Sequence, residues 1–168
     1  DHRDLHSFPT RRSSDLVGGH ASTRNALLPE ARFLAQEGYG ILTADSRGCA
    51  GERATLGYRE ALDVLAMVEY TSRQPGVKWI AGLGFSAGGA ALLLSAPDLP
   101  EIQAIIVEGN FASLDQEIAA QKTKPFSLEW QIQHLVGLAY TLITGTSPAQ
   151  VSPIRSLPSL AEDRKSVV

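Results

Sequence analysis

The sequence predicts an α/β protein with a mostly parallel sheet and flanking helices, and three observations support this fold class. Short apolar runs lie between turn signals, which is typical of buried strands. Segments of helical periodicity alternate with these runs, and such alternation favours a parallel sheet. The chain has 168 residues, 43% of them hydrophobic and 20% charged, which suits one soluble globular domain.

The first expected elements are a helix, a strand and a second helix. Residues 29–36 are predicted to be helical because a proline opens the first turn and Gly38 follows the end. Residues 39–45 form a short apolar run and are expected to be a strand. Residues 56–73 place their apolar positions on one helical face, and the Gln-Pro-Gly segment at 74–76 ends that helix.

The second half of the chain repeats this alternation. Residues 78–85 are predicted to be a strand, and residues 87–95 a helix of small residues. Residues 102–108 are expected to form the next strand. Two helices are then expected at 114–122 and 128–143, followed by a Pro- and Ser-rich loop at 145–162.

Composition and charge exclude several classes of protein. Fifteen Lys and Arg against eighteen Asp and Glu give a net charge of −3, so no nucleic-acid partner is expected. The single cysteine, Cys49, excludes an intramolecular disulfide and a zinc cluster built on several cysteines. No apolar run approaches the roughly 18–20 residues that a membrane span needs.

The two ends of the chain differ from the rest in composition. Residues 1–16 match, in order, the translation of a sequencing adapter, and residues 163–168 match the same adapter read on the opposite strand. We therefore expect 1–16 to be adapter-derived and disordered, 163–168 to be an adapter-derived tail, and 17–162 to be the natural domain. A natural basic arm and tail is the alternative. On the adapter interpretation the true N-terminus is missing, so localisation (cytoplasmic by default) and membrane association stay unassigned.

One motif carries chemistry. Residues 84–88 read G-x-S-x-G and stand between a predicted strand and a predicted helix. A nucleophilic serine, here Ser86, needs such a sharp strand-to-helix turn, and flanking glycines permit the close backbone approach. The backbone N–H of Ala87 is then placed to donate to a developing oxyanion. A phosphate-binding turn is the alternative, but the glycine spacing does not fit G-x-G-x-x-G.

These residues resemble the α/β-hydrolase superfamily, most closely its single-domain serine hydrolases grouped with alkyl esterases and serine-aminopeptidase-like enzymes. Besides the motif at 84–88, four stretches carry the resemblance: the loop 19–24, where the oxyanion loop follows a strand, the D-x-R-G turn at 45–48, the helix opening at 55–60, and the linker-like segment at 152–154.

The resemblance implies a partial α/β-hydrolase fold that lacks the early strands and the C-terminal strands, with a cap-like helical region at about 112–145. It implies that Ser86 attacks a small-molecule ester or amide, with oxyanion N–H groups from Ala87 and the loop around His20. No metal and no cofactor are implied. The catalytic acid and histidine follow the serine in this family, and we expect both to be absent from this chain.

The remaining polar candidates have structural interpretations. His134 lies in a predicted cap helix, Glu108 ends a strand, and Asp115 is the next carboxylate; each is interpreted as structural rather than as base or acid. Asp45 and Arg47 are interpreted as an ion pair that stabilises a turn, with substrate contact as the alternative.

In this fold the strand before the oxyanion loop runs in the middle of the sheet, and residues 10–15 stand at that position. Because a central parallel strand is buried on both faces, charged residues there predict poor folding or aggregation. The chain alone is expected to be inactive. Two alternatives remain open: a non-catalytic binding protein that kept the serine, supported by Gly18 where the family has histidine, and an acyltransferase that uses the same site.

Overall fold

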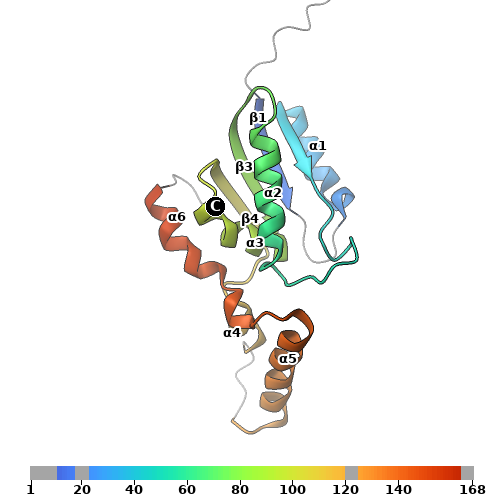
Figure 1. Cartoon of the computed structure of the whole chain (residues 1–168), viewed down its shortest axis with the longest axis vertical. Coiled ribbons are helices and arrows are strands. Elements are labelled where there is room, and N and C mark those ends of the chain that lie inside the picture. Colours follow the sequence, from blue (N-terminus) through green and yellow to red (C-terminus); the bar gives the residue numbers. More distant parts are fainter. Residues whose placement is uncertain (1–10, 18–22, 120–124, 164–168) are drawn as a thin grey trace, which may run out of the picture.

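A computed structural model describes residues 11–17, 23–119 and 125–163. These described residues form a four-stranded parallel sheet in the order β2-β1-β3-β4, with helices packed on it (Figure 1). This arrangement confirms the predicted α/β class. The strands are β1 (Arg11–Val17), β2 (Tyr39–Thr43), β3 (Val77–Phe85) and β4 (Ile102–Glu108).

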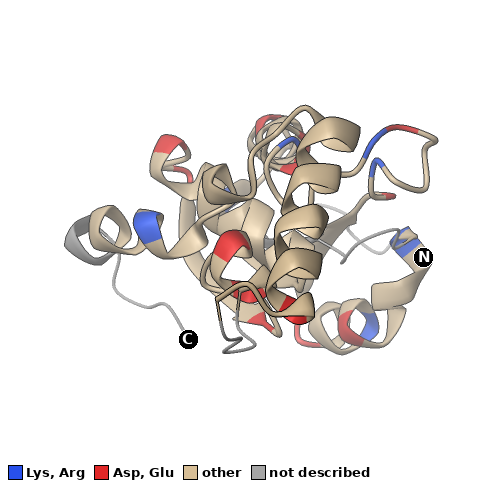
Figure 2. Ribbon diagram, turned by 90° about the horizontal axis from the view of Figure 1, so that it is seen from below, with Lys and Arg blue, Asp and Glu red and all other residues tan. Residues whose placement is uncertain are grey.

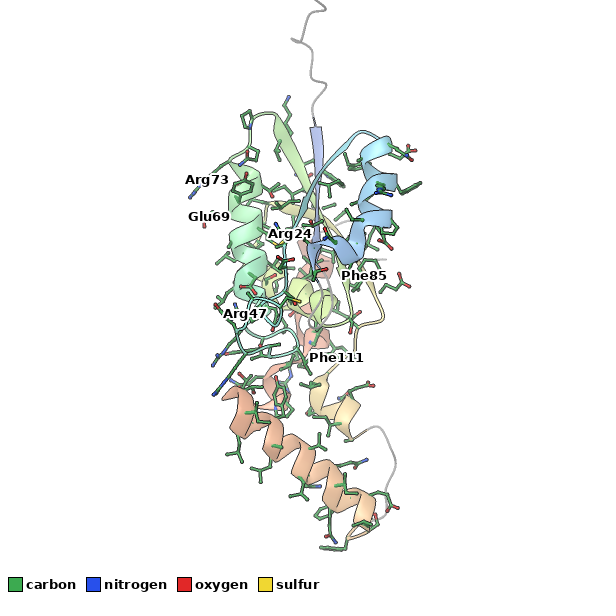
Figure 3. All side chains as sticks on the ribbon, turned by 90° about the vertical axis from the view of Figure 1, so that its right-hand side faces the viewer. Arg24, Arg47, Glu69, Arg73, Phe85 and Phe111 are labelled. Carbon is green, nitrogen blue, oxygen red and sulfur yellow. The ribbon has the colours of Figure 1, made fainter. Side chains whose placement is uncertain are left out.

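The helices follow the predicted alternation. Helix α1 lies on one face of the sheet, whereas α2 and α3 lie together on the other (Figures 1 and 3). The principal helices are α1 (Leu28–Gln36), α2 (Glu60–Ser72), α3 (Ala87–Ser95), α4 (Leu114–Ile118), α5 (Leu128–Thr144) and α6 (Leu157–Asp163), and the 3₁₀ turns are η1 (Arg24–Leu27), η2 (Ala96–Asp98), η3 (Pro148–Gln150) and η4 (Pro153–Ser156).

The loop predicted at 145–162 is wrong in part. Its segment contains η3, η4 and most of α6, and prolines stand in the first turns of both 3₁₀ helices. Leu160 is only 1% exposed and belongs to the main hydrophobic core. Tertiary burial of this leucine therefore fixes a helix that the Pro- and Ser-rich composition does not predict.

The core lies between the sheet and the α2–α3 pair. Helix α3 is apolar all round and buried along almost its whole length, which is typical of a helix covered on every side. Its Leu92 packs so closely on β3 that a Cβ added at Gly82 would lie 2.6 Å from the leucine side chain. The other core residues include Val64, Val68, Ile80, Ile102 and Ile105.

The structure differs from the expectation of disorder for residues 11–16. These residues belong to β1, which pairs with β2 on one side and β3 on the other. For example, Ser14 aligns with Ile41 of β2 and Ala81 of β3. The central position is the one predicted from the resemblance. Backbone ladders need no particular side chain, so a polar segment can fill a vacant central position when both neighbours are present. Residues 1–10 lie outside the described residues.

The helices α4 and α5 lie beyond the carboxyl ends of the strands (Figure 1). Acidic and basic residues are scattered over several elements in the view of Figure 2. Among the described residues, no helix combines the length and the apolar character needed to cross a bilayer.

Candidate active site

Ser86 occupies the turn between β3 and α3. Its backbone has φ 51° and ψ −122°, a conformation that residues with a side chain rarely adopt. A strained conformation of this kind costs about 1–3 kcal/mol and persists only where the surroundings enforce it. Ser86 is nevertheless exposed, although the residues that follow it in α3 are buried. The turn therefore presents the serine to solvent at the carboxyl edge of the sheet.

The glycines around Ser86 make this turn possible. A Cβ added at Gly84 would lie 2.7 Å from the Cα of Gly89 and 2.8 Å from its nitrogen. A Cβ added at Gly89 would lie 3.1 Å from the carbonyl oxygen of Gly84. Strand and helix thus touch backbone to backbone, as the glycine spacing predicts. Because the obstructing atoms are main-chain atoms, no side-chain movement relieves the clash.

Two backbone hydrogen bonds hold the serine in place. The N–H of Ser86 donates to the carbonyl oxygen of Glu108 at 2.9 Å, which attaches the turn to the end of β4. The carbonyl oxygen of Ser86 accepts from the N–H of Ala90 at 3.1 Å, which begins α3. Within the part of the chain that the structure describes, no group hydrogen-bonds the Oγ of Ser86.

Ala87 is the first residue of α3 and is 4% exposed. The N–H groups of a first helical turn have no acceptor within the helix, and they lie at the positive end of the helix dipole. The site therefore offers backbone donors and positive potential beside Ser86. His20, the other predicted oxyanion residue, lies outside the described residues.

The segment that follows the His20 loop is fixed by Asp45. One carboxylate oxygen of Asp45 accepts from the backbone N–H of Arg24 at 2.7 Å, and the other lies 3.3 Å from the guanidinium of the same arginine. This pair connects the start of η1 to the end of β2. It is partly exposed, with 65% of the arginine side chain and 37% of the aspartate side chain accessible.

Arg47, which is labelled in Figure 3, has different partners from the one predicted. Its guanidinium donates twice to Asp63 of α2, at 2.5 and 2.9 Å, and lies 3.4 Å from Glu52. The hydrogen bond to Asp63 raises the pKa of Arg47. Asp45 and Arg47 are thus both held in ion pairs, but not with each other. Helix α2 supplies the partner of Arg47, and a reading of the turn alone could not identify it.

Glu60 is a buried carboxylate that the sequence analysis did not single out. It accepts the N–H of Thr55 at 2.8 Å, the hydroxyl of Thr55 at 2.7 Å and the N–H of Gly57 at 2.9 Å. Burial raises the pKa of Glu60, but these hydrogen bonds outweigh burial and the net pKa is lowered. An acidic residue soon after a Thr-x-Gly segment at a helix start is the signal that could have found it.

The loop held by Glu60 contacts both the serine helix and the outer helix. A Cβ added at Gly57, which has φ +131°, would lie 2.9 Å from the Cβ of Ala90 in α3. The hydroxyl of Tyr140 in α5 donates to the carbonyl oxygen of Thr55 at 2.7 Å. The buried carboxylate therefore orders one segment that connects α3 to α5.

The other candidates for base and acid lie on the outer helices. His134 of α5 and Asp115 of α4 line one open cavity of about 230 Å³. His134 places Nδ1 2.9 Å from the carbonyl oxygen of Trp130, and its ring contacts the ring of that residue at a tilt of 39°, with centroids 3.9 Å apart. Asp115 accepts from the hydroxyl of Ser113 and from the N–H of Gln116. The hydrogen bond from Ser113 lowers the pKa of Asp115.

These groups are not joined to the serine. Among the described residues, no hydrogen bond or ion pair connects His134 or Asp115 to Ser86. Glu108 hydrogen-bonds Ser86 through its carbonyl oxygen, and the residue is exposed. The described residues thus combine a presented serine with backbone donors, without a base in contact with it.

Solved structures resemble the chain, although no family model and no curated protein matches its sequence. The esterase Pf2001 of Pyrococcus furiosus matches with a TM-score of 0.61 and 23% identity, over 94% of this chain and 72% of that protein. A structure of the metagenome-derived lipolytic enzymes LipS and LipT matches with a TM-score of 0.53 and 19% identity, over 73% of this chain and 52% of that protein. Est1E from Butyrivibrio proteoclasticus matches with a TM-score of 0.50 and 24% identity, over 58% of this chain and 40% of that protein.

These likenesses establish the fold. The parallel sheet with its flanking helices is part of an α/β-hydrolase fold, as the resemblance implies. The chain spans between 40% and 72% of the length of these three solved proteins.

Proposed function

We propose that this chain is part of a serine hydrolase that cleaves carboxylic esters, with Ser86 as the nucleophile. The observation that carries the proposal is the exposed serine at φ 51°, enforced by the backbone contact of Gly84 with Gly89. Strain of this kind at an exposed serine between a strand and a helix is typical of a turn that presents a nucleophilic hydroxyl. The likeness to esterases and lipolytic enzymes supports ester bonds as the substrate class; amides are the wider class.

The chemistry follows from the groups at the turn. The Oγ of Ser86 forms a bond to the ester carbonyl carbon while a base takes its proton, and the carbonyl oxygen becomes an oxyanion. The N–H of Ala87 and the loop around His20 hold that oxyanion. The alcohol leaves with a proton from the base, and water then releases the acid from the serine. No step of this sequence requires a metal or an organic cofactor.

We further propose that the base and its orienting acid lie outside these 168 residues. His134 and Asp115 have local partners on α4 and α5, and no contact joins them to the serine. A serine without its base is a poor nucleophile, so the chain alone is expected to be inactive. This proposal includes the adapter origin of residues 1–16 and 163–168, with 17–162 as the natural part and about 112–145 as its cap-like region.

The first experiment is a long DNA read of the parent template across the junctions at Leu16/Val17 and Glu162/Asp163. The expected result is an apolar strand upstream and an Asp-then-His pair downstream. A reading frame that begins and ends as printed would overturn the adapter origin and the placement of base and acid outside the chain.

The second experiment measures hydrolysis of p-nitrophenyl esters by the intact protein. Ser86→Ala is expected to reduce turnover at least about 10³-fold, because the covalent step is lost. The matched control is Ser72→Ala, at the exposed end of α2. Turnover that survives Ser86→Ala unchanged would overturn the proposed nucleophile. The 168-residue chain is expected to give no turnover above its own Ser86→Ala variant.

A further inference from the structure

Helix α5 presents its more apolar face to solvent. Seven of its apolar residues fall on one contiguous arc of about 160° at 3.6 residues per turn. These seven side chains are between 48% and 74% exposed: Leu128, Ile132, Leu135, Val136, Leu138, Leu142 and Ile143.

The opposite face of α5 is the one that contacts the rest of the molecule. Tyr140 donates to the carbonyl oxygen of Thr55, Thr144 is 5% exposed, and Gly137 lines the cavity shared with α4. A surface helix normally turns its apolar face inward and its polar face to water. Here the arrangement is reversed, and the outward face has no partner among the described residues.

The size of this surface exceeds what a monomer ordinarily exposes. Seven side chains at these exposures present on the order of 700 Å², whereas the largest apolar patch of a soluble monomer is about 300–600 Å². Pairing two such faces buries on the order of 1,200 Å² or more in total, which is where specific interfaces begin.

The charged residues at the two ends of α5 favour a second copy of this chain as the partner. The only Asp, Glu, Lys or Arg in α5 is Glu129, at its N-terminal end. At the C-terminal end, Arg53 donates to the carbonyl oxygen of Ile143 at 3.0 Å, and the Arg59 guanidinium lies near Gly145. In an antiparallel pair of α5 helices, the Glu129 of each copy comes opposite the arginines of the other. The two helix dipoles also oppose each other favourably.

A membrane surface fits this helix less well. Helices that lie on anionic membranes carry Lys and Arg along their polar face, and α5 contains neither. Its polar face is also occupied by contacts with the body of the protein.

We infer that α5 is a homodimerisation helix, which pairs antiparallel with α5 of a second copy about a two-fold axis near Val136. This inference rests on the exposed face and the end charges of α5, and it is independent of the proposed hydrolase activity.

Directed cross-linking tests the pairing and its direction in the full chain with Cys49→Ser. Val136→Cys is expected to give a covalent dimer with a short bis-maleimide, because this position meets itself at the two-fold axis. Leu128→Cys alone is expected not to cross-link, whereas a mixture of Leu128→Cys with Ile143→Cys is expected to do so. Absence of the Val136→Cys dimer, or equal self-cross-linking of Leu128→Cys, would overturn the antiparallel pair.

Sedimentation velocity over a range of protein concentrations supplies a matched comparison. Leu135→Asp on α5 is expected to weaken dimerisation at least about tenfold, as for a central interface residue. Leu62→Asp on α2 replaces a leucine of nearly equal exposure, 63% against 62%, and is expected to leave the dimer unchanged. Equal effects of both variants, or a wild-type chain that stays monomeric, would overturn the inference.

Exchanging the charges of Glu129 and Arg53 distinguishes specific antiparallel pairing from non-specific hydrophobic association. Glu129→Arg and Arg53→Glu are each expected to weaken the dimer several-fold, and the double variant is expected to restore it. Failure of the double variant to restore the dimer, when both single variants weaken it, would overturn the antiparallel charge pairing.

Discussion

Strands β3 and β1 are neighbours in one sheet, yet their sequences have little in common. β3 reads VKWIAGLGF and contributes residues to the core, whereas β1 reads RRSSDLV. Both form parallel ladders with a neighbour on each side, and each ladder that involves β3 contains one register shift. Strand pairing therefore follows from the backbone and the space available, while the side chains decide how stable the sheet is.

The largest expected effect concerns the close contact between β3 and α3. Gly84→Ala places a Cβ 2.7 Å from the Cα of Gly89, so β3 and α3 must separate or distort. We expect a loss of about 3 kcal/mol in the free energy of unfolding, measured by urea denaturation. Gly137→Ala is the control: a Cβ there meets nothing within 4 Å, and a gain of about 0.5–1 kcal/mol is expected in a helix. Equal effects of the two variants would contradict the close-contact account.

The next effect comes from substitutions that make the sequence of β1 more like that of β3. Asp15 aligns with Leu42 and Gly82, in the interior of the sheet. Replacing Ser13 and Asp15 together by valine removes two polar residues from a strand that has a neighbour on each side, and adds β propensity. We expect stabilisation of about 2 kcal/mol and a sharper thermal transition. A sharp two-state transition in the unaltered chain would contradict the expected cost of the polar strand.

A smaller effect concerns Glu60. Its carboxylate orders the segment 55–57, which contacts both α3 and α5. Glu60→Gln removes the charge from a group with three buried hydrogen bonds and is expected to cost about 1.5 kcal/mol in the free energy of unfolding. Glu69→Gln is the control, because Glu69 makes an exposed ion pair with Arg73 (Figure 3) and should change stability by less than about 0.5 kcal/mol.

The pH dependence of the Glu60 contribution has a definite sign. Its folded-state pKa is lowered relative to the unfolded state, so its stabilisation is fully present above the unfolded pKa. That stabilisation is lost as the pH falls through the folded pKa. The difference in Tm between the wild-type chain and Glu60→Gln is therefore expected to shrink in acid. A difference that grows in acid would contradict the lowered pKa.

The smallest effect concerns the exposed pair of Asp45 with Arg24. Asp45→Asn is expected to change the free energy of unfolding by less than about 1 kcal/mol, because the ion pair is screened by solvent. Its measurement is the same urea titration at low and high salt, where the difference should narrow as salt is added. A loss of several kcal/mol would mean that η1 depends on Asp45 far more than its exposure implies.

Local sequence signals were sufficient for the parts of the fold that rest on local chemistry. The alternation of strands and helices and the strand-to-helix turn at Ser86 were predictable, because glycine spacing and apolar runs act over a few residues. Helix α6, fixed by burial of Leu160, was not, since its partners lie far along the chain. The outward apolar face of α5 and the pairing of Arg47 with Asp63 depend on tertiary placement in the same way.

The hydrogen bond from the Ser86 N–H to Glu108 gives the turn an unusual spectroscopic property. Ser86 is exposed, yet its amide hydrogen is held by the end of β4 and is released only when β3 and β4 separate. Its exchange with deuterated solvent should therefore be slow for so exposed a residue and should match the rates of the β3–β4 ladder. The amide of Ser86 thus reports how often this edge of the sheet opens.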